Sequence, residues 1–225
     1  MALNRHVYID FARKRYKAII AFLIVFYMVG LIGMVLPRTF FLFLKLIPLA
    51  LILSFVALAF FHASKMERKT ILCFLSIYFI AFGVEAFGVN TGIVFGHYEY
   101  GDGLGFKLLK TPLIIGINWL FLVYTTAAVV EKFKLPVYLK ILLSSTGMLL
   151  YDIVLEQVAP KLDMWHWKNE IIPFHNYLAW FVLAALFHSV LKILKIRIEN
   201  KLALLILLCQ FLFFLLLFIS FKLMP

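Results

Sequence analysis

The sequence predicts an all-α protein, a polytopic membrane bundle of about seven transmembrane helices. Hydrophobic residues make up 65% of the 225-residue chain, more apolar surface than a soluble domain can bury. These residues gather in runs of about twenty, the length that a helix needs to cross a bilayer. Short polar segments separate the runs, and none is long enough to fold as a soluble domain. We therefore expect a single integral-membrane domain over residues 1–225.

Seven apolar segments account for the predicted spans. They lie approximately at 18–36, 42–62, 70–89, 112–131, 136–155, 174–194 and 201–221. With a helical rise of ~1.5 Å per residue, each covers about 28–33 Å, close to the ~30 Å hydrocarbon core. Prolines stand at or near the predicted ends, where helices tolerate them. The first run is long for a signal-peptide core and has no Ala-x-Ala site after it, so we expect it to be retained.

The basic residues predict the orientation. Fifteen of the 22 Lys and Arg residues lie in the N-terminal segment or in the loops on the same side. The positive-inside rule then places the N-terminus in the cytoplasm. Because the charge of +11 is spread between apolar runs, it does not indicate a nucleic-acid partner.

Acidic and amide side chains show the opposite bias and gather near the outer ends of the predicted helices. Glu85 lies about one turn inside its helix end, and Asp152 and Glu156 lie at the end of the fifth span. At a similar depth the fourth and sixth spans carry polar and aromatic residues: Asn118, Trp119, His175, Asn176 and Trp180. Acidic residues inside a membrane are costly and indicate a functional site.

Asp152 and Glu156 are spaced i, i+4 and therefore share one face of a helix. No Lys or Arg lies within these helices at that depth to pair with them. Two carboxyl groups so close together, and partly removed from water, would leave one protonated near neutral pH. That arrangement favours general acid catalysis.

The sequence lacks the motifs that several other chemistries require. The six histidines form no HxxxH cluster, there is no CxxC and no Walker loop, and the seventh span has no lysine at its middle. Asp152-x-x-x-Glu156 matches the aspartate-rich diphosphate–magnesium motif poorly. We therefore expect neither a metal nor a cofactor.

Two polar segments flank the acidic cluster. Residues 85–105 contain six of the eleven glycines and predict a shaped loop. Residues 160–180 contain three of the four tryptophans, which are either interfacial anchors or a wall beside the acid. Such a wall suits a polyene and a transient cation, because aromatic faces stabilise positive charge.

An ordered set of residues resembles the integral-membrane carotenoid biosynthesis proteins, which include carotenoid 1′,2′-hydratases and bisanhydrobacterioruberin hydratases. The resemblance covers about residues 80–185. It consists of Glu85-x-x-Gly-Val-x-Thr-Gly-x-x-Phe-Gly-x-Tyr-x-Tyr, Leu104-Gly, Pro112, Asn118-Trp119, Asp152, Trp165-x-Trp167, Pro173 and Asn176-x-x-x-Trp180. The family pattern has a proline directly after the glutamate of Asp-x-x-x-Glu, whereas here Gln157 follows and the proline is Pro160.

The resemblance implies hydration of the terminal double bond of an acyclic ψ end group, which gives a tertiary alcohol. Asp152 is then the proton donor, and Glu85 shares that proton or acts as base toward water, with Glu156 the third catalytic candidate. The expected substrate-binding residues are Asn118, Trp119, Tyr98, His97, Trp165, Trp167, Asn176 and Trp180. The implied substrate is a carotenoid such as γ-carotene, lycopene or a longer relative.

Two alternatives share some of these features. A carotenoid cyclase or end-group isomerase begins with the same protonation, and a non-enzymatic carotenoid-binding membrane protein needs only the pocket. We expect the chain in the cytoplasmic membrane of a bacterium or archaeon, with the site toward the outer side. Its expected partners are the carotenoid, the lipid bilayer and other carotenoid biosynthesis enzymes.

Overall fold

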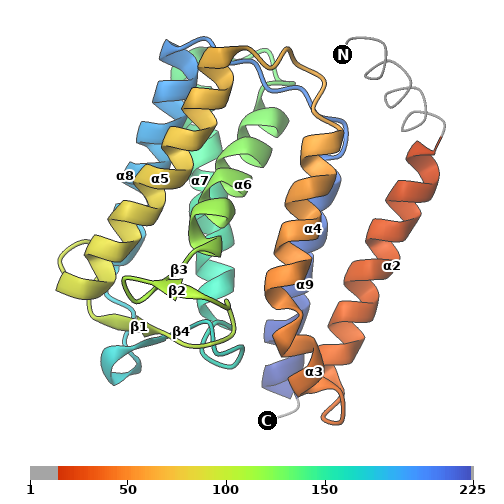
Figure 1. The fold of residues 1–225 in the computed structure, drawn as a ribbon, viewed down its shortest axis with the longest axis vertical. Coiled ribbons are helices and arrows are strands. Elements are labelled where there is room, and N and C mark those ends of the chain that lie inside the picture. Colours follow the sequence, from red (N-terminus) through yellow and green to blue (C-terminus); the bar gives the residue numbers. More distant parts are fainter. Residues whose placement is uncertain (1–14, 224–225) are drawn as a thin grey trace.

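The computed structural model describes residues 15–223 and is mostly helical (Figure 1). The helices are α2 (Tyr16–Val35), α3 (Phe40–Lys45), α4 (Ile47–Phe60), α5 (Arg68–Thr91), α6 (Ile114–Val130), α7 (Val137–Glu156), α8 (Phe174–Ile193) and α9 (Ala203–Leu223). The described residues also form four short strands at one end of the bundle (Figure 1): β1 (Tyr98–Tyr100), β2 (Lys107–Leu108), β3 (Thr111–Pro112) and β4 (Trp165–Trp167). A 3-10 turn, η1 (Lys168–Glu170), follows β4.

Among the described residues, five helices are long and apolar enough to cross a membrane: α2, α5, α7, α8 and α9. Helices α4 and α6 are apolar but shorter, with 14 and 17 residues. The helices therefore support a membrane protein, whereas the seven-span count and the cytoplasmic N-terminus stay predictions. Arg5, Arg13 and Lys14, which contribute to the orientation prediction, lie outside the described residues.

The predicted second span, 42–62, is wrong as a single helix. The helix is interrupted at Leu46, so α3 ends at Lys45 and α4 begins at Ile47. Pro48 lies in the first turn of α4, where its missing N–H is tolerated, whereas inside a longer helix it would break the ladder. Hydropathy runs on through this break because the residues on both sides are apolar.

Helix α6 is the central helix of the bundle. Nearly all of its side chains are buried, and it packs against α4, α5, α7, α8 and α9. In Figure 1, α5, α7 and α8 lie on one side of α6, and α4 and α9 on the other, with α2 outermost against α9. A helix that is apolar all round is expected in such a position.

The outer helices bury one stripe and expose an apolar face. In α5 the buried stripe includes Cys73, Ile77, Ala81 and Glu85, which recur every fourth residue. Phe79 on the opposite face is 63% exposed. An apolar outer surface and a carboxyl group on the inner face are the arrangement expected of a helix in lipid.

The strands add a β element to the predicted all-α fold. β1 and β4 form an antiparallel pair in which Tyr98 lies opposite Trp167, and Tyr100 opposite Trp165. Helix α5 runs on to Thr91 and ends at Gly92, whose φ of 72° is the left-handed C-cap conformation. The chain then reaches β1 across the end of the bundle.

The turn after α7 holds the end of β1 in place. Asp163 accepts a hydrogen bond from the Asp102 amide through Oδ2 (2.8 Å), and its Oδ1 lies 3.1 Å from His166 Nε2. Gly101 packs directly against Asp163, where a Cβ atom would overlap it. The close approach of these backbones fixes where the aromatic residues of β1 and β4 lie.

Candidate functional site

Glu85 is a buried carboxyl group on α5 that accepts three hydrogen bonds. Tyr98 and Tyr100 donate to its Oε2 at 2.7 and 2.8 Å. Trp119 of α6 donates through Nε1 to its Oε1 at 2.8 Å. Both oxygens of Glu85 thus have donors, and those donors come from two other elements of the fold.

Glu156, at the end of α7, is held in the same way. Trp165 and Trp167 donate their indole N–H groups to its Oε2 at 2.9 and 2.7 Å. Asn176 of α8 donates to its Oε1 at 3.3 Å. Glu156 is 4% exposed, so these three donors replace the water that a surface carboxylate would have.

Asp152 differs from the two glutamates. It is fully buried, and its one hydrogen bond to the described part of the chain is long, 3.5 Å from Asn176 Nδ2 to Oδ2. Within residues 15–223, no partner reaches its Oδ1. The Asn176 amide therefore bridges the two carboxyl groups of α7, and one oxygen of Asp152 accepts no hydrogen bond from the described residues.

The β1–β4 pair explains how four donors reach two carboxyl groups. Side chains alternate between the two faces of a strand, so Tyr98 and Tyr100 point to one face. The register places Trp165 and Trp167 on that same face. The intervening residues, Glu99 and His166, are exposed on the other face.

Burial raises the pKa of Tyr98 and of Tyr100, and the nearby Glu85 raises both further. Both phenols therefore keep their protons across the physiological range and act as donors. They cannot act as bases toward a substrate near neutral pH.

One small cavity joins these groups. Its lining consists of Glu85, Phe95, Tyr98, Tyr100, Ile115, Asn118, Trp119, Glu156, Trp165, Trp167, Asn176 and Trp180. The free space for water centres is about 20 Å³, and a cavity of roughly 10–15 Å³ on this measure holds one water molecule. Across the cavity wall, Trp119 and Trp180 stack with ring centroids 4.0 Å apart.

Most residues expected at the site line this cavity. Asp152 does not, because it lies behind Asn176 and Glu156. His97 is exposed beside Gly92 and is also absent from the lining. Their expected roles stay predictions, as does the absence of a cofactor or metal. In the described chain, no three His, Cys, Asp or Glu residues form a metal-binding group.

Sequence reasoning assigned no role to Tyr100, which belongs to the motif of the resemblance and donates directly to Glu85. A signal for it was present, because Tyr-Glu-Tyr and Trp-His-Trp alternate with period two and are rich in aromatic residues, as strands are. It also missed Phe95, whose side chain is 1% exposed and lines the cavity.

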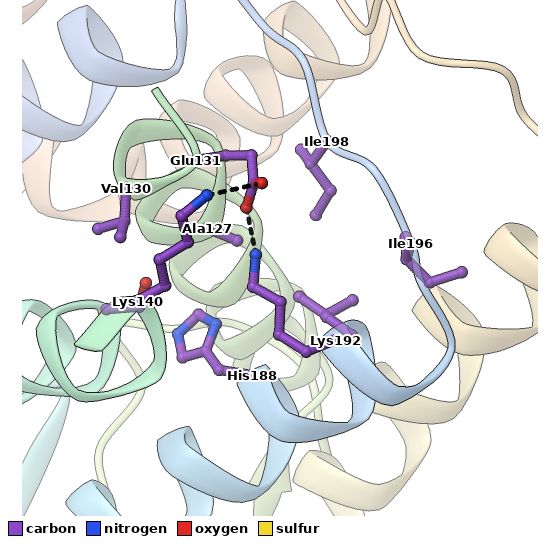
Figure 2. A pocket seen from close by; sticks show the side chains of 10 residues that line it. Ala127, Val130, Glu131, Lys140, His188, Lys192, Ile196 and Ile198 are labelled. Carbon is purple, nitrogen blue, oxygen red and sulfur yellow. Dashed lines mark hydrogen bonds and ion pairs between the residues drawn. The ribbon is translucent and has the colours of Figure 1, made fainter. Parts of the chain in front are cut away.

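A second polar cluster lies at the other end of the bundle. Figure 2 shows Glu131 between Lys140 and Lys192, with His188 beneath them. Glu131 accepts hydrogen bonds from both lysines, at 2.9 Å from Lys140. The cluster joins the end of α6 to α7 and α8, and its opposite charges are already paired with one another.

A comparison with protein-family models finds one whose description is carotenoid biosynthesis protein, matching residues 46–224. The match includes every residue of the carboxyl cluster and its donors. Searches of curated proteins and of solved structures each found no match.

Proposed function

This chain belongs to the carotenoid biosynthesis protein family, and on that premise we propose that it hydrates a carotenoid end group. The reaction adds water across the terminal ψ-end double bond of an acyclic or monocyclic carotenoid and gives a tertiary alcohol. Family membership supports a role in making carotenoids. The finer assignment comes from the chemistry of the site.

The observation that carries the proposal is the gathering of three buried carboxyl groups, two of which line a space large enough for a water molecule. Glu85 and Glu156 line the cavity, and Asp152 is joined to it through Asn176. All the hydrogen-bond donors that the structure shows to this cluster are uncharged. Three adjacent carboxylates without a cation are strongly disfavoured in a dry site, so the cluster retains at least one proton.

Protonation of Asp152 would interfere with fewer accepted hydrogen bonds than protonation of either glutamate. Both oxygens of Glu85 and of Glu156 already accept hydrogen bonds, which favour the ionised form. Asp152 Oδ1 has none in the described residues. We therefore assign the resting proton to the Asp152–Glu156 pair, with Glu156 the member that faces the cavity.

The reaction then needs no further component. The proton adds to the less substituted carbon of the terminal double bond, whose electron pair forms the new C–H bond and leaves a tertiary cation. A water molecule attacks that cation through oxygen, and Glu85 takes the released proton. Proton exchange between the carboxyl groups restores the starting state, and the net change is the addition of one water.

The surrounding aromatic residues suit this intermediate. Indole and phenol faces stabilise a nearby cation, and Trp119, Trp165 and Trp167 all line the cavity. A carotenoid end group exceeds the present space, so its binding requires the lining to move. Tyr98 and Asn118 are half-buried members of the lining, whereas the others are buried, so we expect these two to move first.

The test is expression of the full chain in a host that accumulates acyclic carotenoids, with pigments analysed by mass spectrometry in heavy-oxygen water. Hydration predicts a product heavier by one labelled water. A cyclase or isomerase would give an isomer of unchanged mass, and a binding protein would leave the pigment unaltered. Either result would contradict the proposal. Glu99→Gln is the matched control for Glu156→Gln and should keep the activity, since Glu99 lies on the exposed face of β1.

A further inference from the structure

A second and much larger cavity lies away from the carboxyl cluster, between α2, α3, α4 and α9. Its free space is about 440 Å³, and its walls are almost wholly apolar. Phe26 and Gly30 come from α2, Phe43 and Ala50 from α3 and α4, and Phe213 and Phe214 from α9. An enclosed apolar cavity of about 150 Å³ takes a molecule the size of benzene, so this one, which opens between the exposed side chains of Phe22, Val25 and Leu49, has room for a branched chain of roughly fifteen carbons.

One polar atom in this wall has no partner. Gln210 lines the cavity from the middle of α9, is 2% exposed, and has no donor to its side-chain oxygen among the described residues. The other polar group of the lining, the Tyr27 hydroxyl, is hydrogen-bonded to Ser54 at 2.8 Å. A buried amide oxygen without a donor costs free energy. The oxygen is covered in the observed rotamer, so a ligand hydroxyl satisfies it once the amide turns over and exchanges its oxygen with its nitrogen.

The cavity approaches the acid pair through one aromatic contact. Phe214, in the lining, packs edge-on against Tyr151 with centroids 5.9 Å apart. Tyr151 directly precedes Asp152, and no partner reaches its buried hydroxyl within residues 15–223. A molecule in the cavity is thus separated from the α7 carboxyl groups by this aromatic pair.

We propose that this cavity is a second binding site, for an acyclic isoprenoid chain that ends in a hydroxyl group donating to Gln210 Oε1. The ligand class rests on the proposed function, because hydration produces such an alcohol. The shape and polarity of the cavity stand independently of it. Helices α2 and α3 lie before residue 46, where the family match begins, so part of this wall lies outside the matched region.

A lipid acyl chain would also fit the apolar walls, but it carries no donor for Gln210. The test therefore compares two probes, nerolidol, an acyclic tertiary isoprenoid alcohol, and farnesene, a hydrocarbon with the same number of carbons. Binding of each radiolabelled probe to the purified full chain in nanodiscs is measured at equilibrium. One added hydrogen bond predicts roughly five- to tenfold tighter binding of the alcohol.

Two variants locate the site. Gln210→Leu is expected to abolish the preference for the alcohol while retaining farnesene binding, because only the acceptor is lost. Ala50→Phe fills the cavity and is expected to weaken both probes at least tenfold. Leu212→Ala, on the exposed face of α9, is the matched control and keeps both affinities.

Equal affinity for the two probes in the unaltered chain would overturn the inference. So would a phospholipid that remains bound and is not displaced by nerolidol. The measurement needs no catalysis, so its failure is distinct from that of the proposed function. If the chain prefers the alcohol through Gln210 but makes no hydrated pigment, the binding site stands and the proposed hydratase activity is contradicted.

Discussion

Trp167 donates its indole N–H to Glu156 Oε2 over 2.7 Å and thereby joins the β1–β4 sheet to the end of α7. The ring of the same tryptophan lies against Tyr98, with centroids 5.1 Å apart, and Tyr98 donates to Glu85. A single aromatic contact therefore links the donors of two carboxyl groups on different helices. The site depends on this sheet as much as on the transmembrane helices.

Replacing Asp152 by Asn removes the proton of the acid pair while keeping the size of the side chain. We expect hydration to fall by about 10²–10⁴, the usual contribution of a general acid. Glu156→Gln should have a similar effect, because Glu156 faces the cavity. The measurement is the yield of hydrated pigment per amount of folded protein in membranes.

Normal yield in both variants would rule out the acid pair. If only Glu156→Gln lowered the yield, the proton donor would be Glu156 alone. Monodisperse elution in detergent, compared with the unaltered chain, serves as the folding control.

Removing both phenol donors leaves Glu85 Oε2 without a hydrogen bond. Tyr98→Phe and Tyr100→Phe each delete one hydroxyl, and hydrogen bonds to a charged group contribute about 1.5–3 kcal/mol. We expect the double variant to lose thermal stability and activity, and each single variant to lose less. Thermal unfolding in detergent, followed by tryptophan fluorescence, measures the effect. If the double variant lost no more stability than Tyr138→Phe, whose side chain is exposed, this prediction would be contradicted.

The tryptophans at the site are expected to differ in what their nitrogen contributes. Trp167→Phe keeps an aromatic ring but removes the N–H that Glu156 accepts. Trp180→Phe keeps the ring beside Trp119, where stacking is the observed contact. We expect the first variant to lose at least tenfold more hydration than the second. Equal losses would mean that the aromatic wall, and not the hydrogen bond, is what matters at Trp167.

Much of the helical frame could be predicted from hydropathy. The expected spans 70–89, 136–155 and 174–194 agree closely with α5, α7 and α8, because each is one unbroken apolar run with proline or glycine beside an end. The break at Leu46 escaped because hydropathy does not distinguish one long helix from two short ones.

The donors of the site were harder to predict than its acids. Glu85, Asp152 and Glu156 stand out in a sequence because each interrupts an apolar run. Four of their six donors lie in strands of three residues that pair across more than sixty positions of the chain, whereas Trp119 and Asn176 lie in helices. Short strands give a weak local signal, and their pairing depends on how α5 and α7 place their ends.

Replacing glycine by alanine is expected to have opposite effects on stability at two positions. At Gly101 a Cβ would overlap Asp163, so Gly101→Ala should displace the end of β1 and cost about 1–3 kcal/mol. At Gly83, in the middle of α5, a Cβ meets nothing within 4 Å, so Gly83→Ala should be neutral or stabilise by about 0.5–1 kcal/mol. Thermal unfolding of the two variants side by side is the measurement. Equal midpoints would contradict the packing of Gly101 on Asp163.

Acid should release the turn that holds β1. The hydrogen bond with His166 and the Asp102 amide lower the pKa of Asp163, although partial burial opposes them. A carboxyl group with a lowered pKa in the folded state stabilises it above the usual pKa, and this contribution disappears as pH falls through the lowered value. We expect the Asp102 amide, which donates to the Asp163 carboxylate, to lose hydrogen-exchange protection in that range after correction for intrinsic rates. The Gly101 amide donates to the Met164 carbonyl at 3.0 Å and is the internal control, since that acceptor does not titrate. Parallel loss at both amides would indicate general unfolding of the sheet, and Asp163→Asn should show the low-pH behaviour of Asp102 already at neutral pH.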